Sequence, residues 1–98
     1  MRPAIYDVDD GGANYWVLAR GPAEAVDCLI RHLKSVDQWE EPEEGSGYPS
    51  ATVVPPDKVL TFHADEKAIA HTAEDWLVIY RSIPISDPDL CVLACSEW

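Results

Sequence analysis

The segment of residues 22–36 constrains the fold of this chain more than any other part of its sequence. Apolar residues recur there at helical spacing on one face, namely Pro22, Ala25, Val26, Leu29, Ile30, Leu33 and Val36. On the opposite face acidic residues lead and basic residues follow, which is the order that the helix dipole favours. Gly21-Pro22 marks the start, because proline at the first helical position sacrifices no intrahelical hydrogen bond. We therefore predict a helix over residues 22–36 that buries Val26, Leu29, Ile30 and Leu33.

Short β-prone runs precede this helix. Ala4–Val8 and Asn14–Arg20 are rich in aromatic and aliphatic residues, and the turn-forming sequence Asp9-Asp10-Gly11-Gly12 separates them. This pattern predicts a β-hairpin whose second strand leads directly into the helix.

Further strand patterns follow the helix, at residues 51–54, 58–63, 67–71 and 90–95. Within the 58–63 run, Leu60 and Phe62 share one face. The Thr72 hydroxyl can cap a second helix, with Asp75 near the capping-box position. That helix ends at Ile83-Pro84 and carries an apolar stripe of Ala73, Trp76, Leu77 and Tyr80.

The order of these elements predicts an α+β fold, with one mostly antiparallel sheet of four to five strands and two helices on one face. A chain of 98 residues fits a single small domain, 1–98, and 47% of apolar residues is ordinary for a globular protein. The first residues lack the apolar stretch of a signal peptide, and no run approaches the roughly 18 apolar residues of a membrane helix. We therefore expect a cytoplasmic protein.

The composition of residues 37–50 predicts a long acidic loop, because the segment is rich in proline and glycine and contains no basic residue. Trp39 or Tyr48 could order this loop by docking on the core. A loop of this length within a small domain is often functional. Its five acidic residues are the candidate partner-binding residues, namely Asp37, Glu40, Glu41, Glu43 and Glu44.

The net charge restricts the partners. The chain carries 18 acidic against 7 basic residues, a formal charge of −11 at pH 7. Such a surface repels nucleic acids and anionic membranes and attracts basic protein surfaces, so we expect a protein partner with a basic surface. Carboxylates spaced like phosphates would let the acidic loop imitate DNA, whereas the alternative is a loop that only makes the chain soluble. The oligomeric state stays open.

No pattern in the sequence carries catalytic, cofactor or metal chemistry. The run Asp7–Gly11 is similar to the start of a calcium loop, but the twelfth position is Leu18 instead of a bidentate glutamate. Ser46 lies between two glycines without the motif of a nucleophile elbow, and a glycine-rich phosphate loop is absent. We therefore predict a non-enzymatic protein with no cofactor, no catalytic residue and no metal ligand.

The three cysteines, Cys28, Cys91 and Cys95, form no recognisable disulfide framework, and we expect them to be thiols of the core or its boundary. Cys28 lies off the apolar stripe of the first helix. On the last predicted strand, Cys91 and Cys95 lie about 13 Å apart on one face. At that distance they share neither a disulfide nor a zinc ion with His63 or His71.

Several segments carry a resemblance to one family, namely Tyr15–Ala19 followed by a helix, Pro55–Thr61, Thr72–Trp76 and the terminal Leu93–Trp98. The pattern resembles that of small uncharacterised proteins encoded by phages, prophages and plasmids, with their Pro-Asp-x-x-Leu-Thr strand and Thr-Ala-x-x-Trp helix start. After Trp76 the chain departs from the family, because Arg81–Ser86 stands where the family has glycines. The resemblance implies an accessory protein of a mobile element and transfers no functional residue.

These observations predict a small acidic accessory protein that acts by protein binding, with inhibition or DNA mimicry against a host nucleic-acid-binding complex as its sharper form. The alternative is a structural or assembly protein that forms a homo-oligomer through exposed sheet edges or a Trp-rich surface. A contiguous acidic face would favour the first, and a large exposed apolar patch would favour the second.

Overall fold

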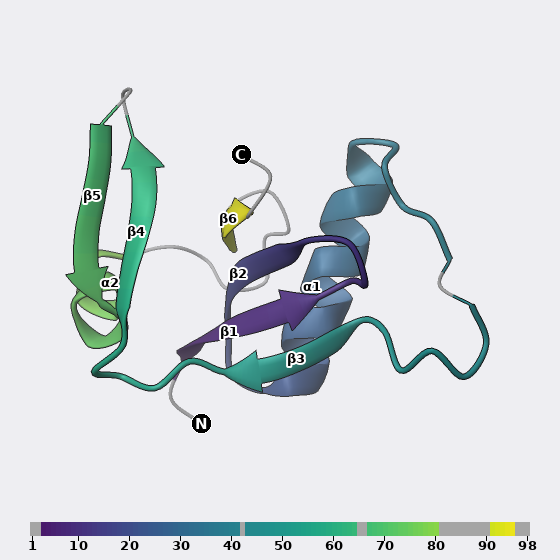
Figure 1. Ribbon diagram of the computed structural model, residues 1–98, viewed down its shortest axis with the longest axis horizontal. Coiled ribbons are helices and arrows are strands. Elements are labelled where there is room, and N and C mark those ends of the chain that lie inside the picture. Colours follow the sequence, from purple (N-terminus) through teal and green to yellow (C-terminus); the bar gives the residue numbers. More distant parts are fainter. Residues whose placement is uncertain (1–2, 42, 65–66, 81–90, 96–98) are drawn as a thin grey trace.

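The structure, a computed structural model, describes residues 3–41, 43–64, 67–80 and 91–95 (Figure 1). Within these ranges the chain forms two helices and six strands, namely β1 (Ala4–Asp9), β2 (Asn14–Ala19), α1 (Pro22–Ser35), β3 (Ser50–Val53), β4 (Val59–Ala64), β5 (Lys67–Thr72), α2 (Ala73–Ile79) and β6 (Val92–Cys95). The α+β class is confirmed, but the six described strands form two sheets, whereas one sheet of four to five strands was expected.

The first sheet has the strand order β3-β1-β2-β6, and every neighbouring pair in it is antiparallel. β1 and β2 form the predicted hairpin, in one register that runs from Ala4 opposite Ala19 to Asp9 opposite Asn14. β3 extends the sheet beside β1, and β6 extends it beside β2. The strand that follows the acidic loop and the last described strand therefore lie at opposite edges of this sheet.

β4 and β5 form a separate two-stranded antiparallel sheet, at the left of the molecule in Figure 1. The sequence predicted these strands within one sheet, so this part of the topology differs from the prediction. The chain leaves the first sheet after Val54, whose N–H donates to the Ile5 carbonyl at 2.9 Å. Pro55-Pro56 follow at once, and because proline has no N–H they cannot continue the ladder.

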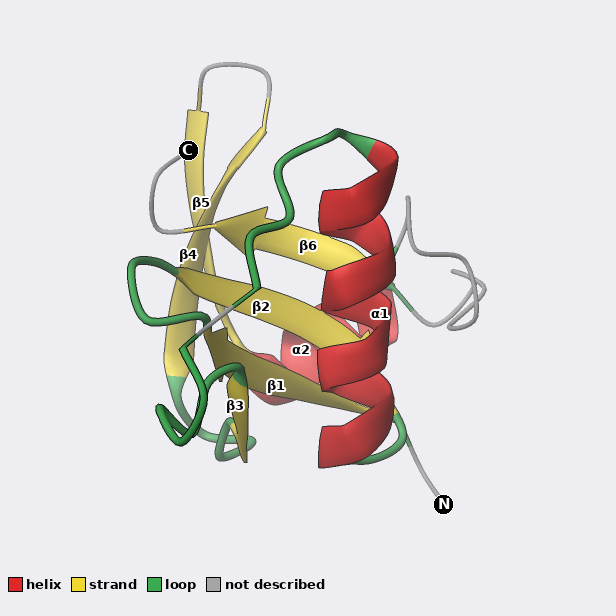
Figure 2. Ribbon diagram, turned by 90° about the vertical axis from the view of Figure 1, so that its right-hand side faces the viewer, coloured by secondary structure: helices red, strands yellow, loops and turns green. Residues whose placement is uncertain are grey.

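The central strands β1 and β2 of the first sheet are largely buried on both faces, and each face has its own core, whereas the edge strand β3 is mostly exposed. Tyr6 and Val8 of β1 pack with the buried residues of α1 in one cluster, the core beneath α1, and this helix runs along one side of the sheet in Figure 2. Ile5 packs instead with Ala73 and Trp76 of α2 in the second core. Because successive residues of a strand point to opposite faces, the two helices cover opposite faces of β1. This arrangement differs from the prediction that both helices lie on one face.

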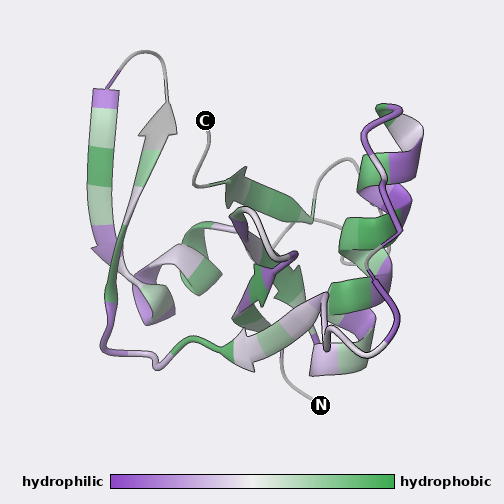
Figure 3. Ribbon diagram, turned by 45° about the vertical axis from the view of Figure 1, so that its right-hand side comes forward, coloured by the Kyte–Doolittle hydropathy of each residue, from purple (hydrophilic) through white to green (hydrophobic). Residues whose placement is uncertain are grey.

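The predicted first helix is confirmed as α1, but its buried face is rotated from the predicted one. Its buried residues are Ala25, Cys28, Leu29 and Leu33. Val26 and Ile30, which the sequence placed in the core, are only half-buried, and Val36 is 47% exposed beyond the helix end. Cys28, which the sequence placed off the apolar stripe, is fully buried. Figure 3 shows hydrophobic and hydrophilic residues alternating along α1, and a hydrophobic β6.

Trp76 of α2 organises the second core. Its indole N–H donates to the Leu60 carbonyl at 2.9 Å, which ties α2 to β4. Its ring centroid lies 4.7 Å from that of Phe62 and 5.6 Å from that of Tyr80, on which it stacks. Partial burial raises the pKa of the Tyr80 phenol. These contacts confirm the predicted apolar face of β4 and stripe of α2. The helix ends at Ile79, with Tyr80 as its C-cap, and therefore earlier than the predicted end at Ile83-Pro84, which lies outside the described residues.

Thr72 caps α2 as predicted, because its Oγ1 accepts a hydrogen bond from the Asp75 N–H at 3.2 Å. We expect Thr72→Ala to lower the free energy of unfolding by about 1 kcal/mol, since the substitution removes this cap. Urea unfolding measures the change, and Thr72→Ser is the control that keeps the oxygen. An equal loss in both variants would assign the effect to the threonine methyl group instead of the cap.

Candidate functional site

Residues 37–49 join α1 to β3 and form the acidic loop. The prediction extended this loop to Ser50, which instead begins β3. In Figure 1 this acidic loop lies at the end of the molecule away from the β4–β5 sheet. The candidate partner-binding residues of the loop are all exposed, namely Asp37, Glu40, Glu41, Glu43 and Glu44. Within the described ranges, none of their carboxylates has a hydrogen-bond or ion-pair partner. The loop therefore presents five uncompensated negative charges to solvent.

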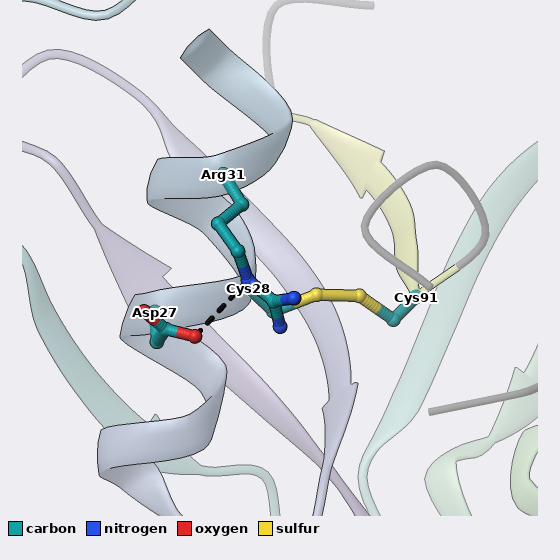
Figure 4. A network of polar contacts seen from close by, with 4 residues as sticks. All are labelled: Asp27, Cys28, Arg31 and Cys91. Carbon is teal, nitrogen blue, oxygen red and sulfur yellow. Dashed lines mark ion pairs between the residues drawn. A yellow bond between two sulfur atoms is a disulfide. The ribbon is translucent and has the colours of Figure 1, made fainter. Parts of the chain in front are cut away.

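Several other carboxylates serve the fold. Asp27 pairs with Arg31 at 3.0 Å on the exposed side of α1 (Figure 4), and Asp7 accepts a hydrogen bond from the Asn14 side-chain amide at 2.8 Å. The exposed pair on α1 contributes little to stability, because solvent screens it. The acidic loop differs from these positions, since its carboxylates make no contact that the fold requires.

Two aromatic residues anchor the acidic loop. Trp39 is half-buried and packs against the core beneath α1. Tyr48 lies against Gly11 in the β1–β2 turn, where an added Cβ atom would come within 3.2 Å of the Tyr48 ring. Gly11 also has a φ of +96°, a conformation that favours glycine. Both contacts agree with the expectation that Trp39 or Tyr48 orders the loop, and they hold it beside the turn.

A cleft of about 430 Å³ lies between the acidic loop, the β1–β2 turn and the end of α1. This volume falls within the range of small-ligand sites. Leu33, Trp39 and Tyr48 contribute apolar surface to the cleft. Among its described lining residues none is basic, and four are acidic, namely Asp10, Glu40, Glu41 and Glu43. The lining suits a cation with an apolar stem, such as an arginine or lysine side chain.

The β1–β2 turn brings Asp10 and Gly11 to this cleft, although no sequence pattern had indicated them as partner-binding residues. The Asp10 carboxylate accepts hydrogen bonds from the N–H groups of Gly12 at 2.9 Å and Ala13 at 2.7 Å. Asp9 accepts one from the Gly11 N–H at 2.8 Å. These bonds are those of a turn, which the composition predicted. The approach of the turn to the acidic loop is a tertiary contact that no local pattern indicates.

Cys28 and Cys91 form a disulfide, which corrects the expectation that all three cysteines are thiols (Figure 4). Both residues are fully buried in the core beneath α1. The bridge ties α1 to the residue before β6, across 63 positions of the sequence. Cys95, at the end of β6, is buried and lies outside the disulfide. The expectation was wrong because it compared cysteines along one strand and placed Cys28 off the buried face.

The described residues hold no group of three or more His, Cys, Asp or Glu side chains placed to share a metal ion. His32 is half-buried, and its Nδ1 finds no hydrogen-bond partner within the same residues. The Ser46 hydroxyl accepts a hydrogen bond from the Tyr48 N–H at 3.3 Å, a contact local to the acidic loop.

Comparisons with models of protein families, with curated proteins and with solved structures find no match to this chain. In the described part of the chain, neither helix has the length and apolar character needed to cross a membrane. A proposal of function for this chain therefore rests on the geometry of the acidic loop and its cleft.

Proposed function

We propose that this protein is a non-enzymatic binding protein that engages a basic surface of a partner protein through its acidic loop. The observation that carries the proposal is the group of five exposed carboxylates without partners in the described fold, placed beside a cleft with aromatic walls. The charge speeds the encounter with a basic partner, whereas the cleft offers a defined contact once the partner has arrived.

The lining of the cleft supports arginine or lysine as the residue of the partner that enters it. The alkyl stem of either side chain would pack on Leu33, Trp39 and Tyr48, while its charged head would lie among the carboxylates. A cation over an aromatic face adds about 0.5–1 kcal/mol of attraction at an exposed site. Arginine has the further advantage of a planar fork that can bind a carboxylate through two hydrogen bonds.

The sharper form of the proposal is an accessory protein of a mobile element that inhibits a host nucleic-acid-binding complex by imitating DNA. The net charge of −11 on 98 residues supports this form, as does the resemblance of the sequence to small proteins of phages and plasmids. A basic groove built for phosphates gains the same counterion-release energy from clustered carboxylates. DNA should then compete with this protein for the partner.

Replacing Glu40, Glu41, Glu43 and Glu44 together with glutamine should weaken binding to the partner by about tenfold or more at low salt, mainly through slower association. The fold should survive, because all four side chains are exposed. Immobilised wild-type protein captures the partner from the native host, and surface plasmon resonance then gives the association rates of both proteins at two salt concentrations. The difference between them should shrink at high salt, because exposed charges are screened beyond about 10 Å at 0.1 M.

A matched control removes four exposed charges elsewhere, with Asp27→Asn, Asp57→Asn, Glu74→Gln and Asp75→Asn. It changes the net charge by the same amount and leaves the acidic loop intact, so its association rate should stay close to that of the wild type. Equal affinity of the loop variant and the wild type at low salt would show that the loop only makes the chain soluble. Failure of a DNA duplex to compete would reject the mimicry and keep the binding function.

A further inference from the structure

β3 is an edge strand of the first sheet, and its outer edge has no partner strand among the described residues. The strand order is β3-β1-β2-β6, so β3 pairs with β1 alone in the described sheet. Ser50, Thr52 and Val53 of this strand are exposed, whereas Ala51 is half-buried against the core beneath α1. The sequence of β3 contains no charged residue that would protect the edge from pairing with a further strand.

The ladder between β1 and β3 shows which backbone groups of β3 point outward. The Val54 N–H donates to the Ile5 carbonyl at 2.9 Å, in the register of this ladder. In an antiparallel ladder, pairs that bond to each other alternate with pairs whose N–H and C=O groups point away. Thr52 therefore bonds to β1, whereas the N–H and C=O groups of Ala51 and Val53 point to the outer edge. These four groups are placed to hold a further strand.

The side chains beside this edge differ between the two faces of the sheet. Val53 lies on the face that α1 covers, because its partner in β1 belongs to the core beneath α1, and it is 52% exposed. The other face of β3 carries the hydroxyl side chains of Ser50 and Thr52. Their partners in β1 are the half-buried carboxylates Asp9 and Asp7. The edge is therefore apolar on one face, and on the other it is polar with negative charge one strand further in.

The acidic loop lies at the start of β3, so the two surfaces are continuous. Pro49 is the last residue of the loop and lines its cleft, and Ser50 begins the strand. In Figure 1, β3 runs from the acidic loop toward the β4–β5 sheet, so an added strand continues at one end toward the loop. The exposed carboxylates of the loop attract a basic segment there and repel a second copy of this chain, which itself carries −11.

We infer that the outer edge of β3 binds an extended segment of the partner protein in which basic residues alternate with apolar ones. The segment pairs antiparallel, as the strands of this sheet do, and its apolar side chains lie on the face of Val53. Its basic side chains extend over Ser50 and Thr52 toward the carboxylates of β1, which lie about 10 Å away, at two strand spacings. This inference rests on the proposed function, because it names the form of the basic partner that the acidic loop attracts.

A capped peptide of four Val-Arg repeats is the probe, and isothermal titration calorimetry measures its affinity for the full chain. Methylating the backbone nitrogens of its valines removes the donors that face β3, and this change should weaken binding by about tenfold or more. Methylating the nitrogens of its arginines is the matched control. The charge and the number of methyl groups stay the same, but the removed donors point away from β3, so this peptide should bind like the unmethylated one.

Amide hydrogen exchange of the protein locates the contact. With saturating peptide, the N–H groups of Ala51 and Val53 should become about tenfold more protected, while that of Thr52 should change little because β1 already holds it. Val53→Pro removes an outward N–H and should weaken peptide binding by about fivefold. Val53→Thr keeps that N–H and suits a strand, so it should bind the peptide like the wild type.

The outcomes separate this inference from the proposed function. A peptide that does not bind, equal affinity of the two methylated peptides, or binding without protection of Ala51 and Val53 each overturns strand pairing at β3. If the peptide binds in that unpaired way and the glutamine variant of the acidic loop binds it more weakly, the acidic loop keeps its proposed role. Pairing with β3 that is equally strong in the glutamine variant supports the edge site and overturns the role of the acidic loop instead.

Discussion

Cys28→Ala and Cys91→Ala are each expected to lower the free energy of unfolding by about 4 kcal/mol, because the disulfide closes a loop of 63 positions that the unfolded chain otherwise explores freely. The bridge also ties α1 to the residue that precedes β6 within the core beneath α1, so its loss removes a covalent connection between the helix and the sheet side of that core. Guanidinium unfolding of oxidised protein measures the change as a lower midpoint. A reducing agent should lower the wild-type midpoint to a similar extent.

The double variant Cys28→Ala with Cys91→Ala provides the internal control. Since the two residues act as one cross-link, its loss should be close to that of either single variant and not to their sum. Cys95→Ala removes a buried cysteine outside the bridge and should keep the sensitivity to reducing agent. If reducing agent leaves the wild-type midpoint unchanged, Cys28 and Cys91 do not form a cross-link in solution.

The elements could be predicted from the sequence, whereas the layers could not. Helices and strands follow local patterns, and α1, α2 and the β1–β2 hairpin lie where those patterns indicate. One signal for burial on both faces was nevertheless present. Tyr15–Ala19 is an unbroken apolar run, which is typical of a strand covered on both sides. In the structure Val17 lies in the core beneath α1, and Trp16 packs against the core of α2. Two helices on one face would leave the other face of this apolar strand uncovered, so the run Tyr15–Ala19 already argued against that prediction.

The candidate site likewise has one part that the sequence indicates, the acidic residues, and one part that it does not, the cleft. Its five acidic residues are neighbours in sequence, so their exposure within a loop could be predicted from composition alone. The cleft could not be predicted, because it requires the β1–β2 turn to lie beside the acidic loop. The contact that holds them together joins Tyr48 to Gly11, residues that occupy distant positions in the chain. The separate β4–β5 sheet likewise depends on where the chain turns after Pro55-Pro56, which the sequence marks as a break without giving its direction.

Leu29→Ala should lower the free energy of unfolding by about 2–5 kcal/mol, since Leu29 is fully buried in the core beneath α1 and truncation leaves a cavity. Val36→Ala is the matched control. The sequence places both residues on one apolar stripe, but Val36 follows the end of α1 and is 47% exposed, so its truncation should change stability by about 0.5 kcal/mol or less. Thermal and urea unfolding of both variants under oxidising conditions measure the difference. Similar losses in the two variants would mean that Val36 also packs on the core, as the helical spacing alone predicts, and that its exposure beyond the end of α1 is wrong.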